Sequence, residues 1–197
     1  VGVTDANAID LGTVAVGQNL TITATGGALT DSGAVTVAGL ATIVSTGQTV
    51  TLGDSTTANF GSLDFAGAAV TITEGSAMVL AASEATGTLD VIATTGNITQ
   101  TGVLNVGGAS SFTTSADDAD ITLTQANALT GAVTFTSTDT NSGNQEDIDL
   151  TNSIAVVLAG SANTGTLDVI ATTGNITQTG VLNVGGTSSF TTSADDA

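Results

Sequence analysis

The side chains with the greatest chemical potential in this chain are carboxylates, which gather in three short clusters. Two clusters contain Asp117, Asp118, Asp120, Glu146, Asp147 and Asp149, and the third is Asp195–Asp196. Carboxylates in a loop are hard oxygen ligands that suit Ca²⁺. Their spacing matches neither an EF-hand loop nor the glycine-rich nonapeptide of calcium-binding β-rolls. Two hypotheses stay open: a calcium site, or solvated loops whose charge keeps a β-rich protein soluble.

The other residue types argue against catalysis. The chain has no Lys, Arg, His, Cys or Tyr, so a nucleophile cannot be paired with a histidine or lysine base. Paired carboxylates remain, as glycosidases use them, but no basic residue could bind an acidic sugar. We therefore expect a non-catalytic protein that requires no cofactor, and we keep a polysaccharide-cleaving solenoid as a remote alternative.

The charge of the chain restricts its partners. Its 18 acidic residues give a formal net charge of −18 with no cationic side chain. Nucleic-acid binding depends on Lys and Arg that neutralise phosphates, so we expect no nucleic-acid partner. The sequence contains no apolar run of about 18 residues, so we expect no membrane insertion.

A long internal repeat organises the sequence. Thr86–Ala119 and Thr164–Ala197 differ only at Ala109 against Thr187, with an offset of 78 residues. A third, more distant copy lies at the front with an offset of 69. A fixed long period is typical of repeat architectures. The repeat predicts three copies along one continuous solenoid: 1–69, 70–147 and 148–197, of which the last is truncated.

Within each copy, apolar residues alternate with threonines at a period of two, as in Leu20–Ala24 and Ile121–Leu123. This pattern is typical of short strands with one buried face. We predict an all-β parallel β-helix with three short strands per coil and three coils of roughly 23 residues per copy. Equivalent residues such as Leu20, Leu89 and Leu167 are then expected to stack along the axis. An antiparallel β-sandwich is the alternative, but it gives no reason for the long repeat.

Several segments resemble the repeats of filamentous-haemagglutinin-like exoproteins, the giant bacterial adhesins of the two-partner secretion type. They are LTITATGGALTDSGAVTVAGLA (20–41), GNITQTGVLNVGGASSFTT (96–114) and DITLTQANALTGAVTF (120–135), together with VTDANAIDLG (3–12). The resemblance implies a right-handed parallel β-helix, export through an outer-membrane partner, and surface attachment or filament formation. The secretion domain typical of this family is not in the sequence, and any export signal is expected upstream.

These observations predict an interior shaft segment of a long secreted bacterial surface protein, which self-associates end to end or laterally as a filament. The alternative is an adhesion module that binds a cell-surface glycan or protein through the inserted loop 137–147. Recurrent Thr-x-Thr pairs such as Thr21 and Thr23 also suggest ice binding, but Asp90 and Ile92 replace them in the next copy.

Overall fold

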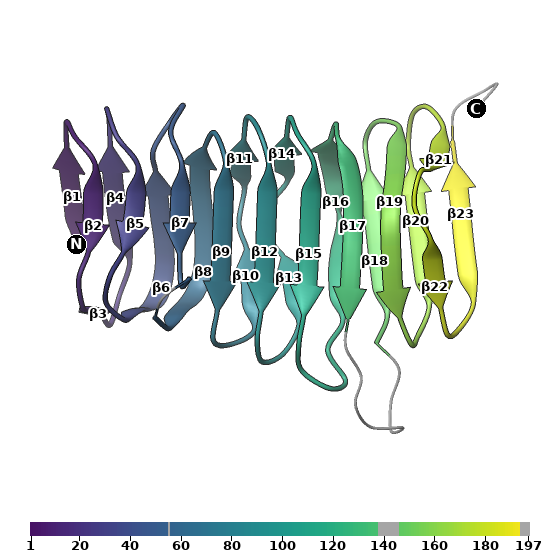
Figure 1. The fold of residues 1–197 in the computed structure, drawn as a ribbon, viewed down its shortest axis with the longest axis horizontal. Helices are drawn as coiled ribbons and strands as arrows, with labels where there is room; N and C mark the ends of the chain where they lie inside the picture. The colour runs from purple at the N-terminus through teal and green to yellow at the C-terminus, as the bar shows by residue number, and fades with distance from the viewer. Residues whose placement is uncertain (55, 138–145, 194–197) are drawn as a thin grey trace.

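The computed structural model describes residues 1–54, 56–137 and 146–193. All strand pairs in the described part are parallel, and the chain winds through about nine coils. In Figure 1 the front strands run downward while the chain advances from left to right and returns behind, which makes the winding right-handed. The prediction of a parallel β-helix is therefore confirmed. Among the described residues no helix is long and apolar enough to span a membrane.

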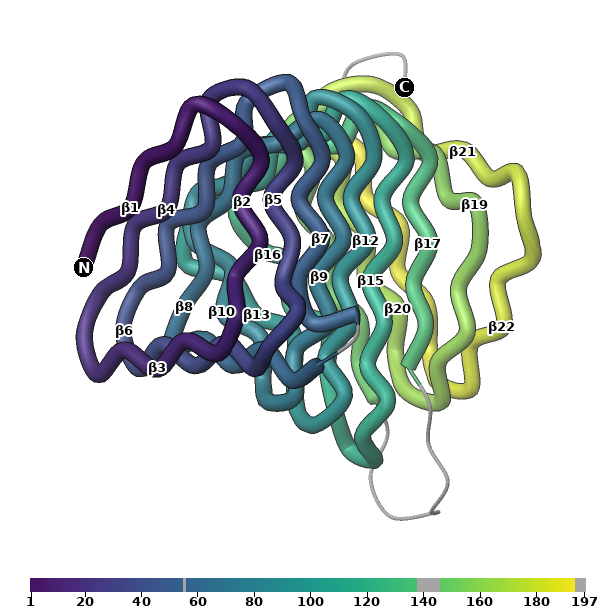
Figure 2. Tube along the Cα trace, turned by 60° about the vertical axis from the view of Figure 1, so that its left-hand side comes forward, coloured from purple at the N-terminus to yellow at the C-terminus, as the bar shows by residue number. Residues whose placement is uncertain are grey.

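Each coil has three sides, visible in the first coil of Figure 2 as β1, β2 and β3. Face 1 consists of β1 (Gly2–Asp5), β4 (Leu20–Ala24), the second halves of β6 (Val35–Val44) and β8 (Ala58–Gly67), β11 (Ser83–Ala85), β14 (Leu104–Val106), the second half of β16 (Ile121–Leu129), the first half of β19 (Val156–Asn163) and β21 (Ile176–Gln178). Face 2 consists of β2 (Ile9–Leu11), β5 (Leu29–Asp31), β7 (Val50–Leu52), β9 (Val70–Glu74), β12 (Leu89–Ala93), β15 (Ser110–Thr114), β17 (Ala132–Ser137), the second half of β19 and β22 (Leu182–Val184). Face 3 consists of β3 (Val14–Val16), the first halves of β6, β8 and β16, β10 (Met78–Leu80), β13 (Ile98–Gln100), β18 (Ile148–Asn152), β20 (Leu167–Ala171) and β23 (Ser188–Thr192).

The core is a narrow column of aliphatic side chains along the axis, because alternate residues of each strand point inward. In β12, Leu89, Val91 and Ala93 are buried while Asp90 and Ile92 point outward and are half-buried. Phenylalanine rings enter the core from all three faces, and on face 2 Phe112 stacks on Phe135 in the next coil at 5.8 Å between ring centroids. The alternation of apolar and polar residues along each strand thus places the apolar side chains of all coils in one shared core.

The predicted stacking of equivalent residues is wrong. Leu20 pairs with Ala41 on face 1, Leu89 pairs with Val70 and Ser110 on face 2, and Leu167 lies on face 3. The coils are also shorter than 23 residues in places. Between paired residues the coil takes 19 residues from Val70 to Leu89 and 21 from Leu89 to Ser110. A copy therefore does not end after a whole number of coils.

Candidate functional site

Asp120 and Asp147 belong to a ladder of side chains at the corner that precedes face 3. The ladder consists of the residues immediately before β13, β16, β18 and β20. Asn97 Oδ1 accepts a hydrogen bond from the Asp120 backbone N–H at 3.1 Å. Asp120 Oδ1 accepts one from Asp147 N–H at 2.9 Å, and Asp147 Oδ1 accepts one from Thr166 N–H at 2.7 Å. Each side chain thus satisfies a backbone donor of the next coil, as Asn and Asp do at turns.

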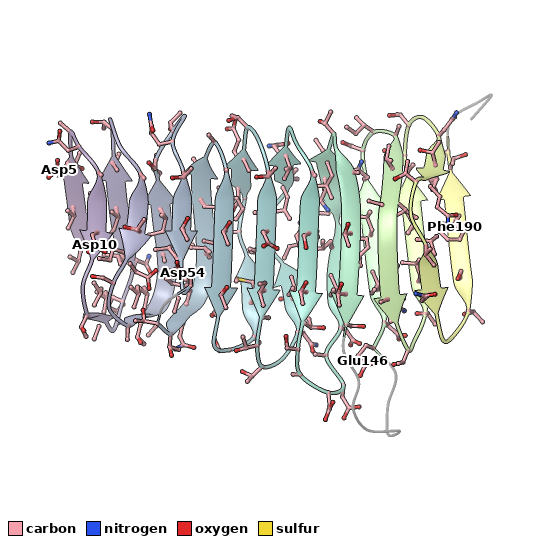
Figure 3. The ribbon with its side chains drawn as sticks, in the orientation of Figure 1. Asp5, Asp10, Asp54, Glu146 and Phe190 are labelled. Carbon is pink, nitrogen blue, oxygen red and sulfur yellow. The ribbon has the colours of Figure 1, made fainter. Side chains whose placement is uncertain are left out.

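Glu146 is buried beside this corner, at the lower edge of the solenoid in Figure 3. Its Oε1 accepts a hydrogen bond from the Asp118 backbone N–H at 3.0 Å, and the Thr164 hydroxyl donates to its Oε2. Its carbonyl oxygen accepts a hydrogen bond from Gly165 N–H at 3.0 Å. The hypothesis of a solvated loop is therefore wrong for Glu146, whereas Asp117 and Asp118 are exposed.

Asp149 lies on the outer side of face 3, where it pairs in register with Thr122 and Asp168 of the adjacent coils. Burial raises the pKa of Asp149, and the negative charges of Asp168, Asp147 and Asp120 raise it further. One carboxylate oxygen of Asp168, Oδ1, is buried and accepts no hydrogen bond. Face 3 therefore places two like charges on neighbouring strands, which is unfavourable.

The structure brings the two clusters together, because Asp118 contacts Glu146 and Asp120 contacts Asp147. Over the described residues, however, no three acidic side chains form a group suited to hold a metal ion. The carboxylate oxygens that meet here accept hydrogen bonds from the protein itself. Calcium binding stays a prediction, and Asp195–Asp196 lies outside the described residues.

The proposed ligand-binding loop 137–147 lies mostly outside the described residues, which include only Ser137, Glu146 and Asp147 of it. A hollow of about 560 Å³, lined in part by Ser137, lies at the edge of face 2. Threonine, serine and asparagine side chains of β17, β19 and β22 line this hollow, and none of the six predicted site residues does. The described residues that line the hollow can offer hydrogen bonds to a ligand, and none of them is charged.

Sequence reasoning missed a buried acid, Glu74 at the end of β9. Its Oε1 accepts hydrogen bonds from Phe60 N–H and from the Ser76 hydroxyl, both at 2.8 Å. Its Oε2 is buried without any hydrogen-bond partner. Burial raises the pKa of Glu74 to about 7, although both hydrogen bonds lower it. The repeat offered a signal, because this position holds the polar residues Asp5 and Asn152 in the other copies.

Comparison with known proteins gives a family without a described activity. A family model described as repeats of unknown function (DUF5649) matches residues 1–64, 67–136 and 145–196. No curated protein and no solved structure matches the chain. The three matched ranges cover most of the 197 residues. The chain therefore belongs to this family of repeats of unknown function.

Proposed function

We propose that the chain is a shaft segment of a long extracellular bacterial surface protein, with a mechanical role and no catalytic one. The observation that carries the proposal is the unbroken parallel pairing of strands from β1 to β23 around one apolar core. Each coil is tied to the next by backbone hydrogen bonds on three sides, so a pull at one end is shared among many bonds. A solenoid of this kind is built to extend and to resist bending.

The corners support the same proposal. The Asn97–Asp120–Asp147 ladder and the reciprocal pair of Gln100 and Asn127 hold adjacent coils together by side-chain hydrogen bonds. In that pair, Gln100 Nε2 donates to Asn127 Oδ1 and Asn127 Nδ2 donates to Gln100 Oε1, both at 2.9 Å. Polar groups that in an enzyme would face a substrate are here used between coils.

The resemblance to filamentous-haemagglutinin-like repeats supports the extracellular, adhesin-type setting. In that setting the partners would be further copies of the same chain, joined end to end or laterally, and a glycan or protein of a cell surface. Lateral contact between rods of net charge −18 requires screening, so we expect Ca²⁺ to promote it and a chelator to reverse it.

Electron microscopy of the chain and of tandem multiples of it tests the shaft. We expect unbranched rods that lengthen by about 43 Å per added chain, because each chain winds through about nine coils and coils of a solenoid rise by about 4.8 Å each. Irregular or compact particles would contradict the proposal. A glycan or protein bound by the native chain and lost when 138–145 is deleted would favour the adhesion module instead.

A further inference from the structure

Equivalent strands of the three copies lie on three different faces of the solenoid. β4 of copy one pairs with β1 and β6 on face 1. Its counterpart β12 pairs with β9 and β15 on face 2, and its counterpart β20 pairs with β18 and β23 on face 3. The outer residues Thr21, Asp90 and Asp168 occupy the same position in the repeat, yet they point in three directions.

The number of strand positions per copy explains this arrangement. Copy one holds β1 to β8, of which β6 and β8 each cover two faces, which makes ten positions. Copy two holds β9 to β17, of which β16 covers two faces, and this again makes ten. Ten positions on a three-sided coil are three coils and one further side. Each copy is therefore turned by one face relative to the copy before it, although the copies differ in length by nine residues.

This turn sets the spacing of equivalent surfaces. With about 4.8 Å per coil, successive copies rise by about 16 Å, and a copy returns to the same face only after ten coils, about 48 Å. A small folded domain is about 30 Å wide. Copies that followed one another on one face would be too close for two such domains to bind side by side. Copies turned by one face each leave room for every domain.

We propose that the outer surface of each copy is an interaction surface for a folded protein domain, and that the turn between copies lets neighbouring copies be occupied at once. The partner domain carries a basic face, because the chain has 18 acidic residues and no Lys or Arg. The carboxylates that such a domain would meet are distributed over the sides of the rod. Copies two and three present Asp90 on face 2 and Asp168 on face 3 at the same repeat position, where copy one has Thr21, and copy one presents Asp64 on face 1 from another position of the repeat.

Cysteine labelling tests the geometry, because the native chain contains no cysteine. Asp90→Cys with Asp168→Cys places labels at equivalent positions of copies two and three. Thr71→Cys with Thr134→Cys is the matched control, because Thr71, Asp90, Ser111 and Thr134 are paired in successive coils of face 2. All four labelled positions are half-buried outer positions of strands. The control pair is thus three coils apart on one face.

Each variant is biotinylated through a short linker and mixed with monomeric streptavidin, a folded domain, and the complexes are weighed by native mass spectrometry. We expect two domains per chain for the Asp90/Asp168 pair and one for the Thr71/Thr134 pair. One domain on the first pair, or two on the second, would overturn the proposal. Nitroxide labels at the same sites check the folds, with about 14 Å between backbones for the control pair and a longer distance for the other.

The charge of the partner is tested separately with lysozyme, a basic folded domain. At low salt we expect the native chain to bind more than one lysozyme, with weaker binding for the Asp90→Asn/Asp168→Asn variant. Binding should weaken further in about 0.5 M salt, which shortens the range of electrostatic attraction. Unchanged binding in the variant or in high salt would show that the outer carboxylates do not form the surface.

Discussion

The segments Thr86–Ala119 and Thr164–Ala197 have almost the same sequence and different surroundings. Both fold into the same series of strands, β12 to β15 and β20 to β23. The first begins on face 2 and the second on face 3, so their side chains meet different neighbours. Asp90 lies between Thr71 and Ser111, whereas Asp168 lies between Asp149 and Ser189. The comparison shows that the residues of a segment determine its strands, whereas the adjacent coils determine which side chains its own side chains contact.

The two phenylalanines of these segments show the contribution of adjacent coils. Phe112 is fully buried and stacks on Phe135, with 5.8 Å between ring centroids and 21° between ring planes. Its counterpart Phe190, on the last strand in Figure 3, is 47% exposed. Among the described residues, Phe112 lies between the paired strands β12 and β17, whereas the strand of Phe190 is paired only with β20, so the ring of Phe112 is covered by a coil on each side and that of Phe190 by a coil on one side.

The last residues of β9 and β18, Glu74 and Asn152, occupy the same position of the repeat and extend the comparison to polar groups. In copy three, Asn152 Oδ1 accepts a hydrogen bond from Leu129 N–H at 2.9 Å, and its Nδ2 donates to Leu129 O at 3.2 Å. In copy two, Glu74 accepts the corresponding bond from Phe60 N–H, but its second oxygen has no donor. An amide both donates and accepts, whereas a carboxylate only accepts. This buried position at the strand end therefore satisfies both polar atoms of Asn152, whereas at Glu74 burial raises the pKa of the carboxyl group.

The largest difference in the free energy of unfolding is expected between the variants Phe112→Ala and Phe190→Ala. Removing the buried ring of Phe112 leaves a cavity against Phe135 and should lower the free energy of unfolding by about 3–5 kcal/mol. Phe190→Ala should cost under about 1 kcal/mol, because its ring is already half in water. Urea unfolding followed by circular dichroism measures both. Equal losses would contradict the view that the adjacent coil decides how much each ring contributes to stability.

Asn152→Asp should give copy three the arrangement found at Glu74 in copy two, a buried carboxylate with one oxygen that accepts no hydrogen bond. The new carboxylate would face the carbonyl oxygens of Leu129, Ile154 and Ala155, which now accept bonds from the amide. We expect a loss of about 3 kcal/mol at pH 8, because Leu129 N–H would still donate to one oxygen of the buried carboxylate but the other oxygen would have no donor. The loss should shrink at pH 4. Asn183→Asp, on an exposed position that pairs in register with Ala162, is the control with the same added charge and should change stability little.

Glu74→Gln should remove the cost of ionising a buried carboxyl group in copy two. The folded chain holds the Glu74 proton up to about pH 7, whereas the unfolded chain releases it near the ordinary pKa of 4.5. The contribution of Glu74 to stability is therefore full below pH 4.5, falls as the pH rises to 7, and stays low above it. The Gln variant should gain about 2–3 kcal/mol at pH 8 and nothing at pH 4. A gain of equal size at both pH values would exclude ionisation as the cause.

The smallest effect is expected for Asp149→Asn, which removes one of the two like charges on neighbouring strands of face 3. We expect a gain of about 0.5 kcal/mol at pH 7 that decreases with added salt. Asp90→Asn is the matched control, because Asp90 has hydroxyl residues on both sides and no acidic neighbour in register. Thermal unfolding at low and high salt measures the difference, and a gain as large for Asp90→Asn would contradict it.

Part of the candidate site could be predicted from the sequence. The acidic clusters around Asp120 and Asp147 do meet at one corner, as stacked coils require. Their use as acceptors for backbone N–H groups could not be predicted, because it depends on the register between coils separated by an insertion. The burial of Glu146 also depends on Thr164 and Gly165, which follow it by almost one coil. Local composition cannot show which neighbour a side chain acquires in this way.

The sequence by itself determined the strands, their inward and outward faces, and the winding of the chain into a parallel β-helix. Alternation of apolar residues and threonine is a property of each segment, and the long repeat shows which segments correspond. Only the tertiary structure decided on which side of the rod each copy lies. That orientation depends on the number of sides per coil and on the number of strand positions in a copy. A copy turned by one face keeps the same alternation of apolar and polar residues in every strand, so the local pattern does not reveal the turn.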